Sequence, residues 1–374
     1  MQSRYEVEFA VEDLDQYFCF DSETKKVILN KVVRELREDL RSIIIDEAIR
    51  AGEEYEKLKN INFYKLISNR TVFLIILNIL VFIIMSLISP YYFSVDTILS
   101  MTKYGVVIAL ISLGQSLVIL GGGGGIDLSL GSNISLSGIL LGILVNAGVN
   151  IWFACILTIM IGVFLGSIHG VLVAYGKLPA FAVTLGGLYT YGALAMVLTD
   201  GIPISNFPEV FSVLGQGTFL NIPNQVIFIL IPIFIILNWV LNNTVFGRSV
   251  YLVGINDEAA NLSGVNVEKI RTILFSISGG LGAVAAIVMT SWIMTARPNA
   301  GYGLELQAVT VAVLGGIHIF GGKGTLSGTM LSALIITNIG YGLQIANINT
   351  TWQLAILGIL LLGAVLLNKL VGEE

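Results

Sequence analysis

The stretch 247–271, GRSVYLVGINDEAANLSGVNVEKIR, is a polar and charged interval between long apolar segments. It holds six charged residues, as many as the whole of residues 71–246. A charged side chain at the centre of a bilayer is costly, so charged stretches lie outside it. We therefore expect residues 247–271 to form a loop outside a membrane that the flanking apolar segments cross.

The centre of this loop carries local helix signals. Glu258, Ala259 and Ala260 favour a helix, while Gly264 and Asn266 favour a stop and a turn. The pattern predicts a short surface helix, a turn and a return to the membrane. Such an element is suited to docking in a cleft of a partner protein, although a plain connecting loop has the same composition.

The composition of the whole chain supports a membrane protein. Of its 374 residues, 55% are apolar and 12% are charged, against about 25% charged in a soluble protein. We predict an all-α, polytopic membrane protein. No basic stripe suggests nucleic-acid binding, and the two cysteines, Cys19 and Cys155, suggest no disulfide framework.

Charge is concentrated at the N-terminus. Residues 1–70 hold 12 of the 20 basic and 15 of the 25 acidic residues. Apolar residues recur there at helical spacing and predict an amphipathic helix from about Lys25 to about Lys59. We expect a cytoplasmic helical extension on a transmembrane domain at 71–374; it is a packed appendage, a membrane-surface helix or a regulatory contact. Its mixed charges argue against an anchor for anionic lipids.

Ten apolar segments have about the length that a spanning helix needs, roughly 20 residues. They are 71–89, 104–121, 127–147, 151–175, 180–199, 225–242, 271–295, 305–321, 325–345 and 352–370. Basic residues before the first segment place the N-terminus in the cytoplasm. Ten crossings then place the 247–271 loop and the C-terminus there too, and the 200–224 loop outside.

Two glycine-rich breaks separate apolar segments, one at Gly124 and Gly125 and one at Gly321 and Gly322. They suggest a weak internal repeat, as in many transporters. Such glycines permit a helix to break inside a protein-lined cavity. The alternative is that the acid after the first break, Asp127, simply caps the following helix.

No catalytic or metal-binding constellation stands out. His169 and His318 lie in different apolar segments, without Cys or carboxylate partners at ligand spacing. We expect no metal and no cofactor. The sequence singles out no Ser/His/Asp triad, and His169 is either a packing residue or a pore-lining one. Lys323 is followed by Gly324 instead of Ser or Thr, so there is no phosphate-binding loop.

Four stretches carry a resemblance that covers about residues 71–370. They are GGIDLSLGS at 124–132, LPAFAVTLG at 178–186, the loop at 247–267, and PNAGYGLEL at 298–306 with its continuation to FGGKGTLSG at 320–328. Together they resemble the permease subunits of bacterial ABC importers for ribose, xylose and galactosides.

The resemblance implies a non-enzymatic subunit of the bacterial inner membrane. Glu258, Ala259, Ala260 and Gly264 would form the coupling helix that docks in an ABC ATPase, which would hydrolyse ATP. A second permease chain would complete the path, and an extracytoplasmic binding protein would deliver the sugar.

Residues on the translocation path are expected to combine hydrogen-bonding groups with aromatic faces. The candidates are Asp127, His169, Trp292, Asn299, Tyr302, Glu305 and Gln307. Ordinary packing or interfacial anchoring would explain each one singly, and Glu305 would also suit a helix start.

The chain departs from the family pattern at three positions, and these leave the substrate open. His169 stands where members usually have Asn, Tyr191 where they often have Arg, and Gln307 where they usually have Asp. The alternatives are an importer for nucleosides, a furanose-like signal molecule or a branched-chain amino acid. An ATPase-independent carrier or a regulatory membrane protein is a further alternative, but an ion-coupled carrier should show paired intramembrane carboxylates.

Overall fold

The computed structural model describes residues 18–21, 26–29, 70–89 and 91–349, with a few further positions between 352 and 363. The chain divides into two compact units, Met1–Phe73 and Leu74–Glu374. The predicted span at 352–370 and most of the predicted N-terminal helix lie outside the described residues.

The described part of the N-terminal unit is a β-hairpin. β1 (Phe18–Asp21) pairs antiparallel with β2 (Lys26–Leu29), with Phe20 opposite Val27. The predicted helix start near Lys25 is therefore wrong for residues 26–29. The physical reason is local, since β-branched Val27 faces the aromatic ring of Phe20 across the hairpin, and such pairs favour strands.

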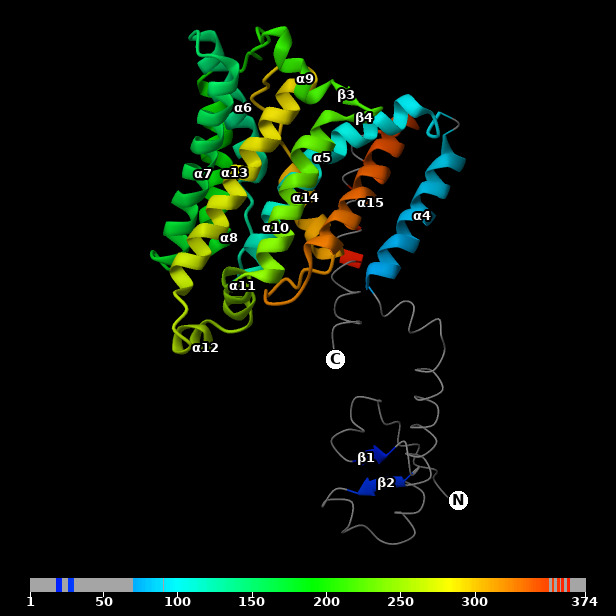
Figure 1. Ribbon diagram of the computed structural model, residues 1–374, viewed down its shortest axis with the longest axis vertical. Helices are drawn as coiled ribbons and strands as arrows, with labels where there is room; N and C mark the ends of the chain where they lie inside the picture. Colours follow the sequence, from blue (N-terminus) through cyan, green and yellow to red (C-terminus); the bar gives the residue numbers. More distant parts are fainter. Residues whose placement is uncertain are drawn as a thin grey trace, which may run out of the picture. The chain divides into compact units, whose positions relative to one another are not determined.

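The second unit is helical throughout its core, and Figure 1 shows its helices running side by side. The long helices are α4 (Arg70–Ile88), α5 (Val95–Leu120), α6 (Leu130–Asn146), α7 (Ile151–Ala174), α8 (Ala180–Val197), η3 (Val226–Leu230) continuing as α10 (Ile231–Asn243), α13 (Val267–Ile293) and α15 (Leu326–Ile345). The short helices are α9 (Ser212–Gly215), α11 (Val245–Ile255), α12 (Asp257–Leu262) and α14 (Leu304–Leu314).

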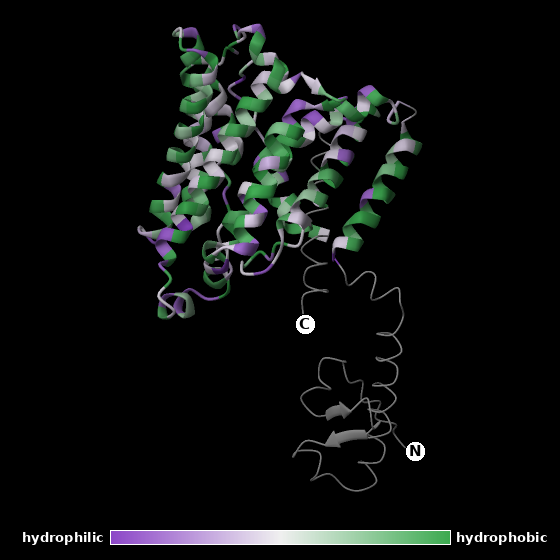
Figure 2. Cartoon of the chain, viewed as in Figure 1, coloured by the Kyte–Doolittle hydropathy of each residue, from purple (hydrophilic) through white to green (hydrophobic). Residues whose placement is uncertain are grey.

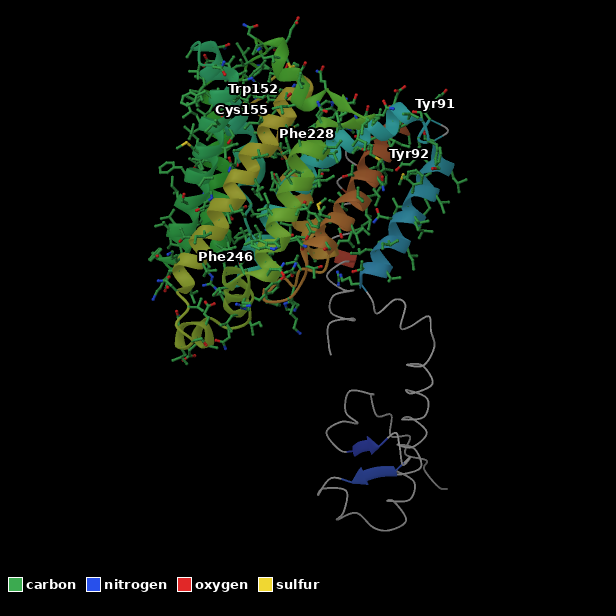
Figure 3. The ribbon with its side chains drawn as sticks, viewed as in Figure 1. Tyr91, Tyr92, Trp152, Cys155, Phe228 and Phe246 are labelled. Atoms are coloured by element: carbon green, nitrogen blue, oxygen red, sulfur yellow. The ribbon has the colours of Figure 1, made fainter. Side chains whose placement is uncertain are left out.

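Seven helices of the described chain are long and apolar enough to cross a membrane. Figure 2 shows hydrophobic residues along the bundle, with hydrophilic residues gathered toward its two ends. The prediction of an all-α, polytopic membrane protein is confirmed. We call the end that carries α12 the α12 end. Figure 3 labels Phe246 near this end and Trp152 near the opposite one.

Two of the predicted spans, 127–147 and 305–321, adjoin irregular segments in the structure. α6 begins only at Leu130, after an irregular segment at 121–129, and α14 ends at Leu314. With 11 residues α14 is about 16 Å long, roughly half of a bilayer core. The end of α14 has a local cause, because Gly316 takes a left-handed conformation with φ of +96°. Each of these two helices is therefore continued by an irregular segment, which is 121–129 before α6 and 315–325 after α14.

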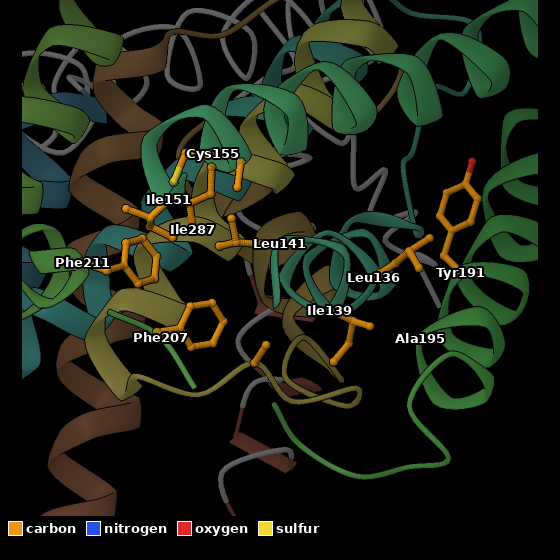
Figure 4. Packing of buried hydrophobic residues seen from close by; sticks show 12 residues of the cluster. Leu136, Ile139, Leu141, Ile151, Cys155, Tyr191, Ala195, Phe207, Phe211 and Ile287 are labelled. Atoms are coloured by element: carbon orange, nitrogen blue, oxygen red, sulfur yellow. The ribbon is translucent and has the colours of Figure 1, made fainter. Parts of the chain in front are cut away.

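α13 lies at the centre of the bundle, against α5, α6 and α7. Glycines let it approach α7 closely, since a Cβ on Gly166 would collide with the carbonyl oxygen of Phe275. Figure 4 shows the apolar cluster beyond this contact, in which Ile151 and Cys155 of α7 pack near Ile287 of α13. α13 also packs on α6, the helix of the first broken crossing.

The connection at 200–224 lies at the end opposite α12. It contains η2 (Glu209–Phe211), α9 and the hairpin of β3 (Thr218–Phe219) and β4 (Ile222–Pro223). A backbone bridge joins Ile204 to Ala296, just after α13. The connection is therefore attached to the C-terminal end of the central helix.

Candidate functional site

Polar side chains cap the N-terminus of α12 and of the helices on either side of it, α11 and α13. Thr244 caps α11, Asn256 caps α12 by accepting a hydrogen bond from the N–H of Ala259 at 3.0 Å, and Asn266 caps α13. Between the last two, Gly264 adopts a φ of +79°, which suits glycine. These caps explain why the predicted helix and turn form where the sequence signals are.

α12 presents both charged and apolar groups to the surroundings. Glu258 and Ala259 are exposed, whereas Ala260 is fully buried against the bundle. Ile255 is 68% exposed and Leu262 is 85% exposed. Apolar side chains gathered on a charged, exposed element are typical of a surface that another protein covers.

Arg271 connects α12 to the bundle. Its Nη2 contacts Asp257 Oδ1 at 2.7 Å, and its Nε donates to the carbonyl of Gly121 at 3.4 Å. The Arg271 side chain is 15% exposed and that of Asp257 is 46% exposed. Gly121 is the C-terminal cap of α5, where a positive charge is favourable. The first residue of α12 is thereby tied to the end of α5.

Next to this contact, glycines let three chain segments meet. A Cβ on Gly254 of α11 would collide with the carbonyl of Leu120, and one on Gly321 would lie 2.5 Å from the Cα of Gly122. The N–H of Gly322 donates to the Leu120 carbonyl at 3.1 Å. We call Gly122, Gly254, Gly321 and Gly322 the glycine junction. It joins both predicted breaks to the helix that precedes α12.

Side chains add to this junction. The hydroxyl of Tyr251 in α11 donates to the carbonyl of Gly324 at 3.0 Å, and burial raises the pKa of this hydroxyl. Of the other predicted break glycines, Gly124 has a φ of +68°, and a Cβ on Gly125 would lie 2.6 Å from the Val118 carbonyl. Both lie in the irregular segment between α5 and α6.

Asp127 is buried in a polar cluster behind the first break. It accepts hydrogen bonds from Ser129 N at 3.0 Å, from Ser129 Oγ at 2.6 Å and from Ser278 Oγ at 3.0 Å. Its own N–H donates to Gln115 Oε1 at 3.3 Å. Asp127 is not the N-cap of α6, because Ser129 occupies that position. Instead the carboxylate connects the broken crossing to α13.

His169 extends this cluster toward α8. Its Nδ1 lies 3.1 Å from Ser129 Oγ, and its ring stacks on Tyr191 at 5.1 Å between centroids. The Ser129 hydroxyl donates its hydrogen to Asp127, so His169 Nδ1 must be the donor to Ser129. A nucleophilic triad places His between Ser and Asp, whereas here Ser lies between the other two. Two departures from the family pattern, His169 and Tyr191, are thus direct partners.

Glu305 lies where the first turns of α6 and α14 meet. Its side chain is 7% exposed, and among the described residues Oε2 has no hydrogen-bond partner. A Cβ on Gly131 of α6 would collide with this oxygen, and one on Gly301 would collide with the Gly131 carbonyl. A carboxylate at helix N-termini is electrostatically favourable. The structure therefore supports the interpretation of Glu305 as a partner of helix dipoles.

Trp292 and Gln307 are brought together by Tyr104. The Tyr104 ring lies 6.4 Å from that of Trp292, tilted by 50°, and its hydroxyl is within hydrogen-bonding reach of the Gln307 side chain. All three side chains are partly exposed. The other two candidates lie in the turn before α14, where Asn299 is exposed and Tyr302 is 89% exposed.

The comparisons with known proteins show the family of the chain. The family model described as "Branched-chain amino acid transport system / permease component" matches residues 97–365. The chain belongs to this permease family. The match begins within α5, so the N-terminal unit of the permease lies outside it.

Curated relatives are similar over about four fifths of the chain. The permease is 37% identical to the ribose import permease protein RbsC of Haemophilus influenzae, over 79% of this chain and 92% of the relative. It is 35% identical to the autoinducer 2 import system permease protein LsrC of Photorhabdus luminescens, over 80% and 90%. It is 36% identical to RbsC of Bacillus subtilis, over 77% and 89%. No solved structure matches the permease.

The sequence analysis missed Arg271 as a connecting residue and Tyr104 as the partner of Trp292 and Gln307. Arg271 was one of several charges in the 247–271 loop, and its contact with Gly121 depends on tertiary packing. Tyr104 stood at the start of an apolar segment, where an aromatic residue is also typical of a membrane interface. No signal in the sequence of the permease distinguished either residue.

Replacing Asp127 should destabilise the permease. In Asp127→Ala three donors lose their buried acceptor, and we expect a loss of about 3 kcal/mol in the free energy of unfolding. Asp127→Asn should lose only about 1 kcal/mol, because the Ser278 hydroxyl can turn and accept from the new amide. Thermal unfolding in detergent measures both.

The control for these variants is Asp200→Asn, at an exposed acid whose left-handed backbone, with φ of +51°, asparagine tolerates. Its melting temperature should equal that of the wild type. Equal melting temperatures for Asp127→Ala and Asp200→Asn would contradict the bonded role of Asp127.

Proposed function

We propose that this permease is the membrane subunit of an ATP-driven importer and carries a neutral monosaccharide such as ribose across the bacterial inner membrane. The observation that carries the proposal is α12, a capped and exposed helix tied by Arg271 to the end of α5. The substrate class is supported by 37% identity to a ribose import permease across 92% of that relative.

In this proposal α12 docks in a partner ATPase, with Glu258, Ala259, Leu262 and Ile255 as its contact residues. The N- and C-termini and α12 lie in the cytoplasm, in agreement with the basic residues before the first span. ATP is hydrolysed on the partner and the permease itself is not an enzyme. A second permease chain and an extracytoplasmic binding protein complete the importer.

The translocation path in this proposal uses the broken crossings. Irregular backbone at membrane depth is tolerated where it is buried in protein or lines a cavity. The glycine junction lies between α12 and both breaks, so a movement of α12 has a direct route to them. The candidate path residues near the breaks are Asp127, His169 and Glu305; those nearer the outer end are Trp292, Asn299, Tyr302 and Gln307.

A second candidate substrate is a furanose-like signal molecule. The observation that favours it is the 35% identity to an autoinducer 2 import system permease over 90% of that relative. Both substrates are small and rich in hydroxyl groups, so both suit the same importer architecture. Uptake measured with each compound separates the two.

The docking of α12 is tested by copurification. We expect tagged wild-type permease, extracted from its native membranes in mild detergent, to bring down an ATPase. Glu258→Arg reverses an exposed charge on α12, and Gly264→Trp adds bulk at a φ of +79°. Each variant should bring down about tenfold less ATPase activity than the wild type. A tenfold ratio corresponds to a loss of about 1.4 kcal/mol in binding free energy.

Matched controls lie at the opposite end of the bundle. Glu209→Arg changes an acid that is also exposed, and Gly148→Trp changes a glycine with a φ of +84° and open space around it. Both should retain the ATPase. If the α12 variants behave like these controls, the docking proposal is wrong; if the wild type brings down no ATPase, the importer proposal is wrong.

A further inference from the structure

Tyr104, Trp292 and Gln307 come from three helices, α5, α13 and α14, and meet in one cluster. We call it the Tyr104 cluster. The tilt of 50° between the Tyr104 and Trp292 rings contrasts with the 24° of the stacked His169–Tyr191 pair. The two rings of the Tyr104 cluster are therefore not stacked face to face on each other.

The cluster lies toward the end opposite α12 and is held by the 200–224 connection. Gln216 Nε2 donates to the Trp292 carbonyl at 3.0 Å, and Lys103 Nζ donates to the Gln216 carbonyl at 3.2 Å. The residues just before Gln216 and Trp292 are also joined, since the N–H of Gly215 donates to Ser291 Oγ at 2.9 Å. The backbone of Trp292 is thus fixed, while its ring remains partly exposed.

This partial exposure distinguishes the Tyr104 cluster from the Asp127 cluster. Asp127, Ser129 and His169 are each at most 3% exposed and satisfy one another. The Tyr104 cluster instead offers two aromatic rings and a neutral amide in an accessible position. Aromatic rings pack against the apolar faces of sugars, while amides both donate to and accept from hydroxyl groups.

We propose that Tyr104, Trp292 and Gln307 form a contact site for the neutral sugar ring on the outer part of its path. The inference rests on the proposed import function and deepens it by naming the residues that meet the substrate. No carboxylate belongs to the site, which favours an uncharged polyol over a cationic ligand. The Trp292 ring packs against the sugar, and Gln307, which lies beside the Tyr104 hydroxyl, bonds the hydroxyl groups of the sugar.

The test is uptake of radiolabelled D-ribose into proteoliposomes that contain the permease with its copurified ATPase and binding protein. Trp292→Ala and Gln307→Leu should each lower uptake about tenfold, and Tyr104→Phe roughly threefold, because contacts to the passing sugar are lost. Trp292→Phe keeps an aromatic face and should recover most of the uptake. ATP hydrolysis in the same vesicles should stay within about twofold of the wild type in every variant.

Controls of the same residue types are available on other helices. Trp239→Ala on α10 and Tyr189→Phe on α8 change side chains that are 59% and 70% exposed, and both should leave uptake unchanged. The inference is overturned if the cluster variants match these controls, or if ATP hydrolysis falls in parallel with uptake, as a merely structural role predicts. A wild type that binds its ATPase but takes up no ribose would contradict the proposed substrate, and the site would be rejected with it.

Discussion

Gly166→Val should be among the most destabilising single substitutions in the membrane unit. Gly162, Gly166 and Gly170 recur at intervals of four along one face of α7, which packs on α13. Small residues at this spacing let two helix backbones approach closely inside a membrane. A Cβ on Gly166 would collide with the carbonyl oxygen of Phe275, and backbone cannot move aside as a flexible side chain can.

We expect Gly166→Val to lower the free energy of unfolding by about 3 kcal/mol. For a domain of this size that corresponds to a fall of roughly 10 °C in melting temperature. Size-exclusion chromatography after heating in detergent would measure the change. The matched control is Gly186→Val in α8, also a glycine of a spanning helix, but one with open space around it. Equal melting temperatures for the two variants would contradict the close packing of α7 on α13.

Arg271→Met should uncouple ATP hydrolysis from transport. The substitution keeps an unbranched side chain but removes the contact with Asp257 at 2.7 Å and the bond to the Gly121 carbonyl. Movement of α12 would then reach the end of α5 through the backbone alone. We expect the ratio of sugar transported to ATP hydrolysed to fall about tenfold, within the usual range of coupling energies between sites.

The comparison with lysine separates the two contacts of Arg271. Arg271→Lys retains a charge for Asp257 but loses the planar fork that also reaches Gly121, so we expect an intermediate ratio. Arg248→Met is the control, because Arg248 is exposed on α11. It should transport as the wild type does. A normal ratio in Arg271→Met would show that this contact carries no coupling.

The element that local signals define best was also predicted best. Glu258, Ala259 and Ala260 favour a helix, Asn256 caps it and Gly264 ends the turn, all within nine residues. Such signals act between neighbours and hardly depend on the rest of the fold. The N-terminal hairpin shows the limit of this approach, because helical spacing suggested a helix where residues 26–29 pair as a strand.

The crossing that contains α14 could not be predicted with its correct length. Hydropathy identifies what is buried, but an extended segment and a helix of equal apolarity give the same signal. The segment 305–321 was therefore predicted as one span, whereas α14 ends at Leu314. The glycines marked a possible break, yet its depth depends on contacts such as that of Gly131 with Gly301, which lie far apart in the sequence.

The sequence by itself determined that this chain is a polytopic helical membrane protein, with a charged loop at 247–271 and a resemblance to sugar importer permeases. These conclusions rest on composition and local sequence patterns, which do not depend on how the helices pack on one another. Only the tertiary structure decided which polar residues meet: Asp127 with Ser278, Arg271 with Gly121, and Tyr104 with Trp292 and Gln307. The physical reason is that these contacts join different helices, whose register is set by close glycine packing across the bundle.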